Sequence, residues 1–231
     1  MSTFVSAIIP AAGSATRMGG PVRKPLLTIG GRPILIHTLR NLVRVKAINE
    51  IIIVVNPKDV ELVQKELGQE LTSLRVSAVI AGGRHRFNSV QIGLRHVDKR
   101  CNLVLVHDAV RPFVAPELVR AVTARARKTG AAILAIPVTD TVKRVHLGRI
   151  AETVDRKPLW LAQTPQVFRR DILEAAYARP RPRWVSDDAQ LVELLGRPVA
   201  IVPGSPLNLK ITTPDDLLLA QALTERMANK L

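Results

Sequence analysis

Apolar, β-branched runs recur along the chain at wide spacing, and polar or turn-forming residues separate them. Most of these runs are continuous rather than alternating, a pattern that is typical of strands buried on both faces of a sheet. We therefore predict six strands, at residues 4–9, 51–55, 76–80, 103–107, 131–138 and 199–202.

Helical patterns lie between several of these runs. Asn56-Pro57 and Thr213-Pro214 each provide a side chain that can cap a helix, followed by proline at the first helical position. Gly130 suits the end of a helix. The predicted helices are residues 33–45, 57 to about 67, 116 to about 130, and one that begins at 214.

Strands that alternate with helices form β-α-β units, so we predict an α/β fold with a mostly parallel twisted sheet and helices on both faces. We take residues 1–231 as one domain. Sheets of this kind bind ligands at the carboxyl ends of their strands. The loops that follow the first, third and fourth predicted strands are therefore the places where we expect a site.

Residues 138–163 break the alternation of strands and helices. Residues 141–145 and 150–154 have the pattern of two strands joined around Leu147-Gly148. A β-hairpin that stands alone is only marginally stable in water. We therefore predict that this inserted hairpin is an arm that packs on another surface, for which a second copy of the chain is a good candidate.

The chain is strongly basic, with 34 Lys and Arg against 19 Asp and Glu, a formal net charge of +15. Such a charge attracts polyanions. The basic residues are spread over several segments and aromatics make up only 3% of the chain, which disfavours nucleic acid as the main partner. No apolar stretch approaches the roughly 18 residues of a membrane span, so we expect no membrane partner. The single cysteine, Cys101, points to a reducing cytoplasm.

The loop after the first predicted strand contains small residues, Pro10-Ala11-Ala12-Gly13, whose backbone N–H groups can approach a phosphate closely. Arg17 and Lys24 add positive charge nearby. The loop has neither the Gly-Lys-Ser/Thr of a P-loop nor the Gly-x-Gly-x-x-Gly of a dinucleotide site. A small-residue turn is more often a tight connection than a site, but the two cations favour a phosphate site here.

Further motifs follow in order. They are Gly82-Gly83-Arg84-x-Arg86-x-x-Ser89, Val106-His107-Asp108-Ala109-x-Arg111-Pro112, Asp140-Thr141-x-Lys143, Thr153-Val154-Asp155-Arg156, Thr164-Pro165-Gln166, Ser186-Asp187-Asp188-Ala189 and Asn208-Leu209-Lys210-Ile211-Thr212. Together with the first loop, and over nearly the whole chain, they resemble the motifs of the 2-C-methyl-D-erythritol 4-phosphate cytidylyltransferases of the non-mevalonate isoprenoid pathway.

The resemblance implies a Rossmann-like nucleotidyltransferase that joins CTP to a polyol phosphate and releases pyrophosphate. Attack on the α-phosphorus builds negative charge on phosphate oxygens, so catalysis depends mainly on positioning and on cations. The catalytic residues implied are Arg17, Lys24, Arg156 and Lys210. A carboxylate at a strand end can hold Mg²⁺, and the resemblance assigns that role to Asp108.

The resemblance also divides the site into two halves. The nucleotide-binding residues implied are Pro10, Ala11, Ala12, Gly13, Gly82, Gly83, Arg86, Ser89, Asp108 and Ala109. The acceptor-binding residues implied are Thr141, Arg111 and Thr164, with the arm reaching across a homodimer. From the residues alone, a turn with a helix cap explains Gly82 and Gly83 equally well. For Arg156 and Lys210, the residues alone favour two surface charges over a shared site.

Three other functions stay open on the sequence. A ribitol-5-phosphate cytidylyltransferase would share the nucleotide half, and the arm residues Thr141 and Arg156 favour the erythritol acceptor over it. A noncatalytic nucleotide sensor would bind CTP without releasing pyrophosphate. A nucleic-acid-binding protein on an α/β scaffold is the alternative that the +15 charge motivates. We interpret His107 as a structural residue, because a phosphate monoester nucleophile is already ionised near neutral pH.

Overall fold

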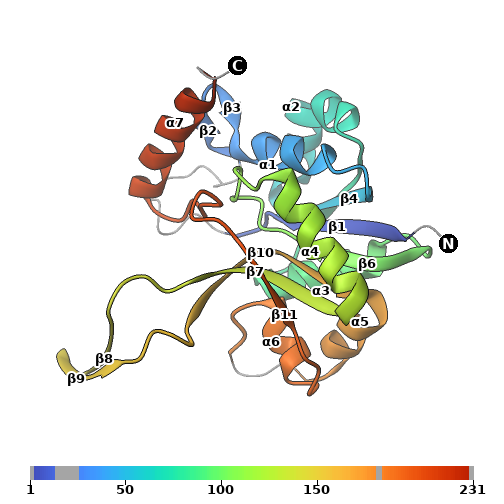
Figure 1. Ribbon diagram of the computed structural model, residues 1–231. Helices are drawn as coiled ribbons and strands as arrows, with labels where there is room; N and C mark the ends of the chain where they lie inside the picture. Colours follow the sequence, from blue (N-terminus) through green and yellow to red (C-terminus); the bar gives the residue numbers. More distant parts are fainter. Residues whose placement is uncertain (1–2, 14–25, 181–183, 229–231) are drawn as a thin grey trace.

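The computed structural model describes residues 3–13, 26–180 and 184–228. Its centre is a seven-stranded sheet in the order β11-β7-β10-β6-β1-β4-β5 (Figure 1). Every neighbouring pair is parallel except those of β10, which is antiparallel to both β6 and β7. The strands are β1 Phe4–Pro10, β4 Ile48–Val55, β5 Val76–Ala81, β6 Cys101–Val106, β7 Ala131–Pro137, β10 Trp160–Arg169 and β11 Ala200–Pro203.

All six predicted strands are confirmed, within a few residues at their ends, and β10 is the strand that the apolar pattern missed. Polar residues Gln163, Thr164 and Gln166 interrupt its sequence, and Pro165 has no N–H for a sheet ladder. The register of β10 on β7 shifts between Gln163 and Gln166. A strand with this composition does not form a continuous apolar run, although its second half is buried.

The four predicted helices are confirmed, with starts within a few residues of those expected. The helices of the structure are α1 Ile34–Val43, the 3₁₀ turn η3 Pro57–Asp59, α2 Val60–Ser73, α3 Arg86–His96, α4 Pro116–Thr129, α5 Arg170–Ala178, α6 Asp188–Glu193 and α7 Pro214–Ala228. Of these, α3, α5 and α6 were not among the four predicted. The Asn56 side chain accepts a hydrogen bond from the Lys58 amide, and Gly130 closes α4 with φ 86°. The end predicted near residue 67 was wrong, because α2 continues through Gly68 to bury Leu71.

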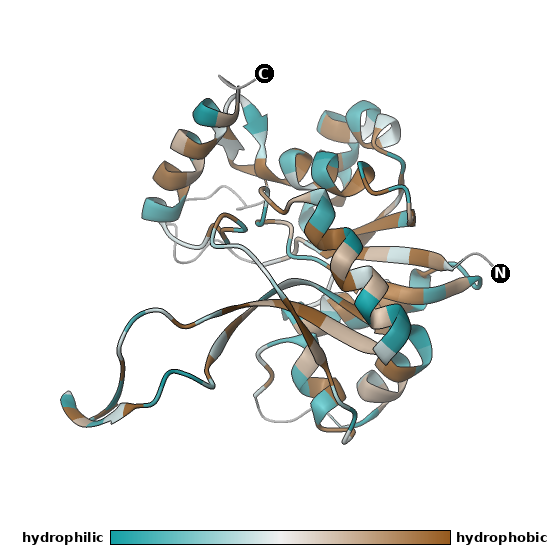
Figure 2. Ribbon diagram, in the orientation of Figure 1, coloured by the Kyte–Doolittle hydropathy of each residue, from teal (hydrophilic) through white to brown (hydrophobic). Residues whose placement is uncertain are grey.

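The sheet is packed on both faces, as predicted. Successive residues of β1 point to opposite sides, so Ile9 joins the cluster that includes Leu39 of α1 and Val122 of α4. Ile8 joins the cluster that includes Val90 of α3 and Leu173 of α5. Figure 2 shows hydrophobic residues along the central strands and interspersed with hydrophilic ones along the helices. Within the described ranges, no helix is long and apolar enough to cross a membrane.

Two small sheets stand outside the central one. β2 Thr28–Ile29 pairs with β3 Arg32–Pro33 beside α7. β8 Val142–His146 pairs with β9 Arg149–Val154, and the turn between them is at Leu147 and Gly148, both with positive φ, as expected for a tight hairpin. This hairpin lies at the end of an extended arm that projects from the body of the molecule (Figure 1).

Candidate functional site

Asp108 is the centre of a charged cluster just beyond the carboxyl end of β6. One carboxylate oxygen accepts a hydrogen bond from Arg86 Nε at 3.0 Å, and the other lies 2.7 Å from Lys210 Nζ and 3.8 Å from Arg111 Nε. Burial by itself would raise the pKa of Asp108, but the charges of Arg86 and Lys210 outweigh it and hold this pKa well below its usual range. Asp108 is therefore an ionised carboxylate held by these cations.

Arg86 joins Asp108 to a second buried carboxylate, that of Asp188 at the start of α6. Arg86 Nη1 lies 2.8 Å from Asp188 Oδ2, and the Tyr177 hydroxyl donates a hydrogen bond to Asp188 Oδ1. Burial acts to lower the pKa of Arg86, but the two carboxylates raise it by more. The guanidinium is thus fixed between α6 and β6 as a permanent positive charge.

A neutral histidine supports the backbone next to Asp108. His107 is fully buried, and burial lowers its pKa to about 4. Its Nε2 lies 3.2 Å from the Arg111 carbonyl oxygen, which can only accept, so Nε2 carries the proton. Nδ1 then accepts from the Thr164 hydroxyl at 3.1 Å, and the same Thr164 oxygen accepts the Asp108 amide at 3.0 Å. His107 is structural, as the sequence indicated.

The segment that carries Lys210 is tied to the loop that carries Asp108. Arg111 Nη1 donates to the Asn208 carbonyl oxygen at 2.6 Å, and Asn208 Nδ2 donates to the Thr164 carbonyl oxygen at 2.9 Å. The Ile211 amide donates to the Val110 carbonyl oxygen. These bonds flank Lys210 on both sides in sequence, so they place its amino group over Asp108.

The loops after β1 and β5 meet at Gly82. A Cβ atom at Gly82 would lie 2.9 Å from Ala12 Cβ and 2.7 Å from Ser89 Oγ, so no larger residue fits there. The Ala11 amide donates to Val54 O in the neighbouring strand, and the Gly83 amide donates to Ser89 Oγ at 3.2 Å. The glycine turn and the small-residue loop therefore form one continuous surface.

A small cavity of about 180 Å³ opens beside the charged cluster. It is lined by Arg86, Asp108, Arg111, Ala162, Gln163, Thr164, Gln166, Ser186, Asp187 and Lys210. The cavity thus brings together three basic side chains from α3, the loop after β6 and the loop before α7. Such an arrangement suits an anionic ligand.

Comparison with known proteins shows to which family the chain belongs. The family model for 2-C-methyl-D-erythritol 4-phosphate cytidylyltransferase matches residues 5–226. The chain belongs to this cytidylyltransferase family. A protein of this name from Syntrophus aciditrophicus is 44% identical over 229 residues, covering 98% of each chain. One from Desulforamulus reducens is 42% identical over 225 residues, covering 96% of each.

Solved structures agree with the cytidylyltransferase fold. The 4-diphosphocytidyl-2C-methyl-D-erythritol synthase of Anaerococcus prevotii matches with a TM-score of 0.84 and 35% identity, covering 97% of each chain. The 2-C-methyl-D-erythritol 4-phosphate cytidylyltransferase of Thermus thermophilus matches with a TM-score of 0.78 and 36% identity, covering 96% of this chain and all of the other.

The residues that the sequence assigned to a cytidylyltransferase site fall into three groups. Arg86, Asp108, Arg111, Thr164 and Lys210 line the cavity, and Ala11, Ala12, Gly82, Gly83 and Ser89 form the surface at the glycine turn. The rest are placed as follows: Pro10 ends β1, Gly13 is exposed, and the buried Ala109 accepts a hydrogen bond from Thr38 through its carbonyl oxygen. Arg17 and Lys24 lie outside the described residues.

Thr141 and Arg156 are not brought into the cytidylyltransferase cluster by this chain. Both are exposed, and they lie next to β8 and β9, which project from the body of the molecule (Figure 1). Arg156 donates a hydrogen bond to the Thr139 carbonyl oxygen within the same arm. The predicted meeting of Arg156 with Lys210 therefore does not occur among the described residues of one chain.

Sequence reasoning assigned no role to three residues that hold the cluster together. Asp188 pairs with Arg86, Asn208 fixes the Lys210 segment, and Gln166 Oε1 accepts the Asp188 and Ala189 amides at the start of α6. All three lie in segments whose sequence resembles motifs of the cytidylyltransferase family. Membership in those motifs was the available signal, but no local pattern indicates which distant side chain each one contacts.

A metal ion at Asp108 would share this carboxylate with the cations that already hold it. Among the described residues, no group of three or more Asp, Glu, His or Cys side chains is arranged to hold a metal. Mg²⁺ in nucleotide enzymes commonly takes only one or two carboxylates, with the substrate phosphates and water as its other ligands. The single ionised Asp108 fits this kind of site, in which the metal arrives with the triphosphate.

Proposed function

We propose that this protein transfers CMP from CTP to the phosphate of 2-C-methyl-D-erythritol 4-phosphate, giving 4-diphosphocytidyl-2-C-methyl-D-erythritol and pyrophosphate. The observation that carries the proposal is the buried Asp108 held between Arg86 and Lys210 at the carboxyl end of a parallel strand, in a chain whose family match extends over residues 5–226. Family membership favours the erythritol acceptor over ribitol 5-phosphate.

In this proposal the loops after β1 and β5 bind the nucleotide. Backbone amides of residues 10–13 would approach the triphosphate, and Gly82, Gly83 and Ser89 would read the cytosine edge. Arg17 and Lys24 would neutralise the charge that develops at the α-phosphorus, Arg17 as a two-pronged donor and Lys24 as a point charge. Arg86, fixed by its two carboxylates, would add a permanent charge on the nucleotide side.

We assign Asp108 as the protein ligand of Mg²⁺. The ion would neutralise triphosphate charge when it is bound. One oxygen of Asp108 must then give up its present partner to bind the ion. Lys210 is the partner more easily displaced, because its side chain is 40% exposed and can turn toward a phosphate. In this scheme Lys210 pairs with Asp108 in the empty enzyme and with the acceptor phosphate in the loaded one.

The acceptor half would combine Lys210, Arg111 and Thr164 of one chain with Thr141 and Arg156 of another. The tip of the arm supports a homodimer, because Leu147 is 87% exposed and Ile150 is 65% exposed on a hairpin that projects away from the described body of its own chain. An arm that covers the partner's cavity would bury these side chains and deliver Arg156.

The reaction needs no general base from the protein. The second pKa of a phosphate monoester is about 6, so the attacking oxygen is largely ionised near neutral pH. His107 is neutral, buried, and engaged at both nitrogens. The protein's contribution is therefore position and charge. We place this chemistry in a reducing cytoplasm, in line with the single cysteine of the chain.

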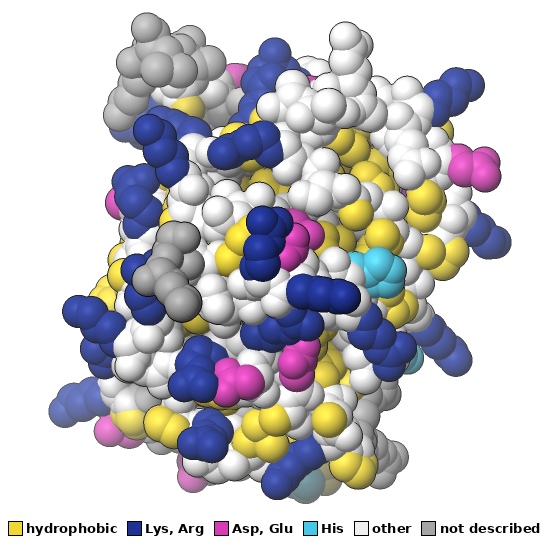
Figure 3. Space-filling view, turned by 90° about the vertical axis from the view of Figure 1, so that its right-hand side faces the viewer, with side chains coloured by type: hydrophobic (Ala, Val, Ile, Leu, Met, Phe, Trp, Pro, Cys, Tyr) yellow, Lys and Arg dark blue, Asp and Glu magenta, His cyan; other side chains and the backbone are white. Residues whose placement is uncertain are grey.

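The +15 charge does not need nucleic acid to explain it. Lys and Arg side chains are scattered over the face shown in Figure 3 and outnumber Asp and Glu there, without forming one continuous stripe. A groove that follows a nucleic-acid backbone would require such a stripe. The face is better explained as a solvated basic surface.

Pyrophosphate release tests the proposal. With CTP and Mg²⁺, the enzyme should release pyrophosphate with 2-C-methyl-D-erythritol 4-phosphate and far more slowly with ribitol 5-phosphate. Lys24→Ala should lower kcat by about 10² to 10³-fold, the usual cost of one transition-state charge contact. Arg125→Ala, an exposed arginine on α4, is the matched control and should leave the rate unchanged. No release with either acceptor, or an unaffected Lys24→Ala enzyme, would overturn the assignment.

A further inference from the structure

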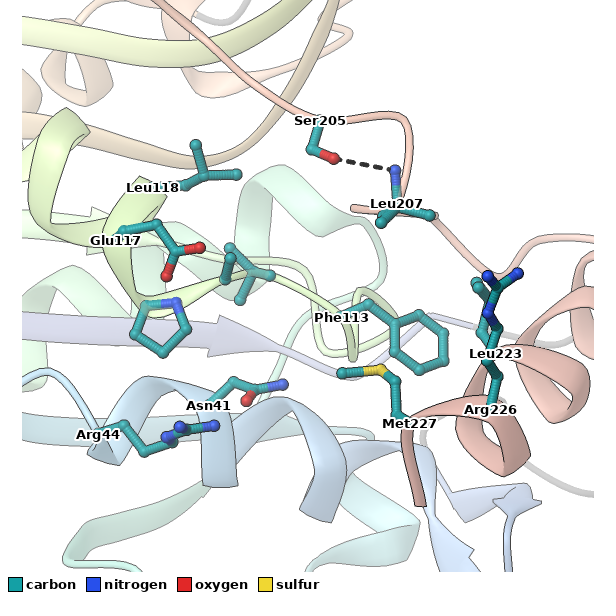
Figure 4. Close-up of a pocket in the computed structure, with 13 residues that line it drawn as sticks. Asn41, Arg44, Phe113, Glu117, Leu118, Ser205, Leu207, Leu223, Arg226 and Met227 are labelled. Atoms are coloured by element: carbon teal, nitrogen blue, oxygen red, sulfur yellow. Dashed lines mark hydrogen bonds between the residues drawn. The ribbon is translucent and has the colours of Figure 1, made fainter. Parts of the chain in front are cut away.

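A second and larger cavity, of about 750 Å³, shares no lining residue with the cavity at Asp108. It lies between α1, the start of α4, the loop after β11 and the last turns of α7 (Figure 4). Its lining consists of Asn41, Arg44, Phe113, Val114, Ala115, Pro116, Glu117, Leu118, Ser205, Leu207, Leu223, Arg226 and Met227. The reaction proposed above uses none of these residues.

The cavity has the size and composition of a small-molecule site. Such sites usually measure about 300–1,000 Å³ and are mostly apolar, with a few polar groups that fix orientation. Here Phe113 of the loop after β6, Leu118 of α4, and Leu223 and Met227 of α7 supply apolar walls. Leu207 is 61% exposed and Met227 is 54% exposed at its edge. Large apolar side chains left open around one hollow mark a surface that a ligand can cover.

The charges around the cavity select the ligand. Arg44 and Arg226 contribute two positive charges and Glu117 contributes one negative charge, a net of one positive charge. None of the three forms an ion pair with another residue in the described ranges. Figure 4 shows Arg44 and Glu117 toward the α1 and α4 side and Arg226 on the α7 side, next to the apolar residues Phe113 and Met227. A ligand with one negative charge and an apolar body matches this lining.

We propose that this cavity is a binding site for a small amphipathic monoanion. The apolar body would lie against Phe113, Leu223 and Met227, and the anionic group would pair with Arg226. Binding at this cavity does not depend on the cytidylyl transfer proposed above, whereas regulation through it rests on that proposed function.

The walls of this cavity continue directly into the charged cluster. Phe113 lies two residues after Arg111 on the loop that follows β6, and Leu207 lies three residues before Lys210. Ser205, which lines the large cavity, accepts a hydrogen bond from Gln163 Nε2 at 2.9 Å, and Gln163 lines the small one. A ligand that shifts Leu207 or Ser205 therefore moves the segment that positions Lys210. We expect occupancy to change the KM for the acceptor more than kcat.

Fluorescence of 1-anilinonaphthalene-8-sulfonate tests the site, because this probe is an aromatic monoanion that brightens in apolar surroundings. The full-length protein should bind it saturably, with one probe per chain. Arg226→Glu should weaken binding by about tenfold or more, the size expected for losing one charge-assisted contact. N-phenyl-1-naphthylamine, the uncharged analogue, should be unaffected by this substitution. Met227→Asp should weaken both probes, and Arg125→Glu, on the exposed face of α4, should weaken neither.

Several results would overturn the proposal. Probe binding that does not saturate would do so, as would equal effects of Arg226→Glu and Arg125→Glu on the affinity for the probe. Loss of probe binding as the protein self-associates would also do so, because it would identify a second copy of the chain as the occupant. Circular dichroism and urea midpoints show whether each variant is folded. Where the wild type binds the probe, an unchanged acceptor KM in pyrophosphate release would remove the regulatory part. An enzyme without cytidylyl transfer would leave the binding result intact and overturn only the function proposed earlier.

Discussion

At the scale of single residues, the Thr164 hydroxyl connects two buried groups of the site. It accepts the Asp108 amide and donates to His107 Nδ1, and both partners are buried. A buried polar group that loses its partner costs about 1–3 kcal/mol. Thr164 thus determines where the Asp108 backbone lies, whether or not it also touches the acceptor.

Thr164→Val and Thr164→Ser form a matched pair for this argument. Valine keeps the shape but leaves both partners of the hydroxyl unpaired, so we expect the free energy of unfolding to fall by about 2–4 kcal/mol. Serine keeps the hydroxyl and should cost less than about 1.5 kcal/mol. Urea denaturation followed by circular dichroism measures both. Equal losses for the two variants would show that packing, not hydrogen bonding, dominates at this position.

His107 should make stability depend on pH in a defined window. Its pKa is about 4 in the folded protein against 6.5 for a free side chain. As pH falls from about 6.5 to 4, the unfolded chain takes up a proton that the folded protein does not, so stability falls, by about 3 kcal/mol in total. The effect is complete below pH 4. Protonation of Asp108, whose pKa is also depressed, removes stability only at lower pH, below about 3.8.

Urea midpoints at intervals between pH 7 and 4 measure this dependence, with His107→Gln as the comparison. Glutamine can donate and accept but does not titrate. The variant is expected to be less stable at pH 7, but the test compares only how the free energy of unfolding changes with pH. The wild type should lose about 3 kcal/mol more than the variant across the window. Parallel curves would mean that His107 is not the responsible group.

At the scale of elements, a strand or helix was predicted correctly where the sequence pattern that specifies it lies within a few neighbouring residues. An apolar run such as β1 or a cap such as Asn56 is complete within a few residues, so these elements were predicted correctly. β10 was missed because Gln163, Thr164 and Gln166 interrupt its apolar pattern, and the hydrogen-bond partners that allow them to be buried are distant in sequence. For the same reason Arg86 was identified from its motif, whereas its partner Asp188, about 100 residues away, was not.

The arm is the element whose stability must come from elsewhere. Its two strands are almost wholly exposed, and Val145, Leu147 and Ile150 are its large apolar side chains at the tip. Ile150→Asp should therefore disrupt the proposed dimer, because association would bury a charge without a partner. Sedimentation velocity should show a dimer for the wild type and a monomer for the variant.

Ile201→Asp is the control for the arm. Ile201 is also an exposed isoleucine, on β11, but it lies in the main sheet, away from the arm. This variant should remain dimeric. A wild-type chain that sediments as a monomer, or a dimer that survives Ile150→Asp unchanged, would show that the arm is not the interface.

At the scale of the whole molecule, the proposed function makes the described site one half of a larger one. The body provides Asp108, Arg86 and Lys210 at the edge of the sheet, and the arm carries Thr141 and Arg156 away from that edge. A two-fold dimer uses the same surfaces on both subunits, so an arm that completes one site is matched by its partner's arm at the other. The body and the arm can therefore be inactivated separately, in different chains.

Mixing two inactive variants tests this arrangement directly. Lys24→Ala damages the nucleotide half in the body, and Arg156→Ala damages the arm, so each homodimer should be inactive. In a mixed dimer the Arg156→Ala body would receive an intact arm from the Lys24→Ala chain, which restores one site of two. Random exchange at equal concentrations makes half of the dimers mixed, so pyrophosphate release should recover to about a quarter of the wild-type rate. If Arg156 served its own chain, every site in the mixture would contain one defect and no activity would return.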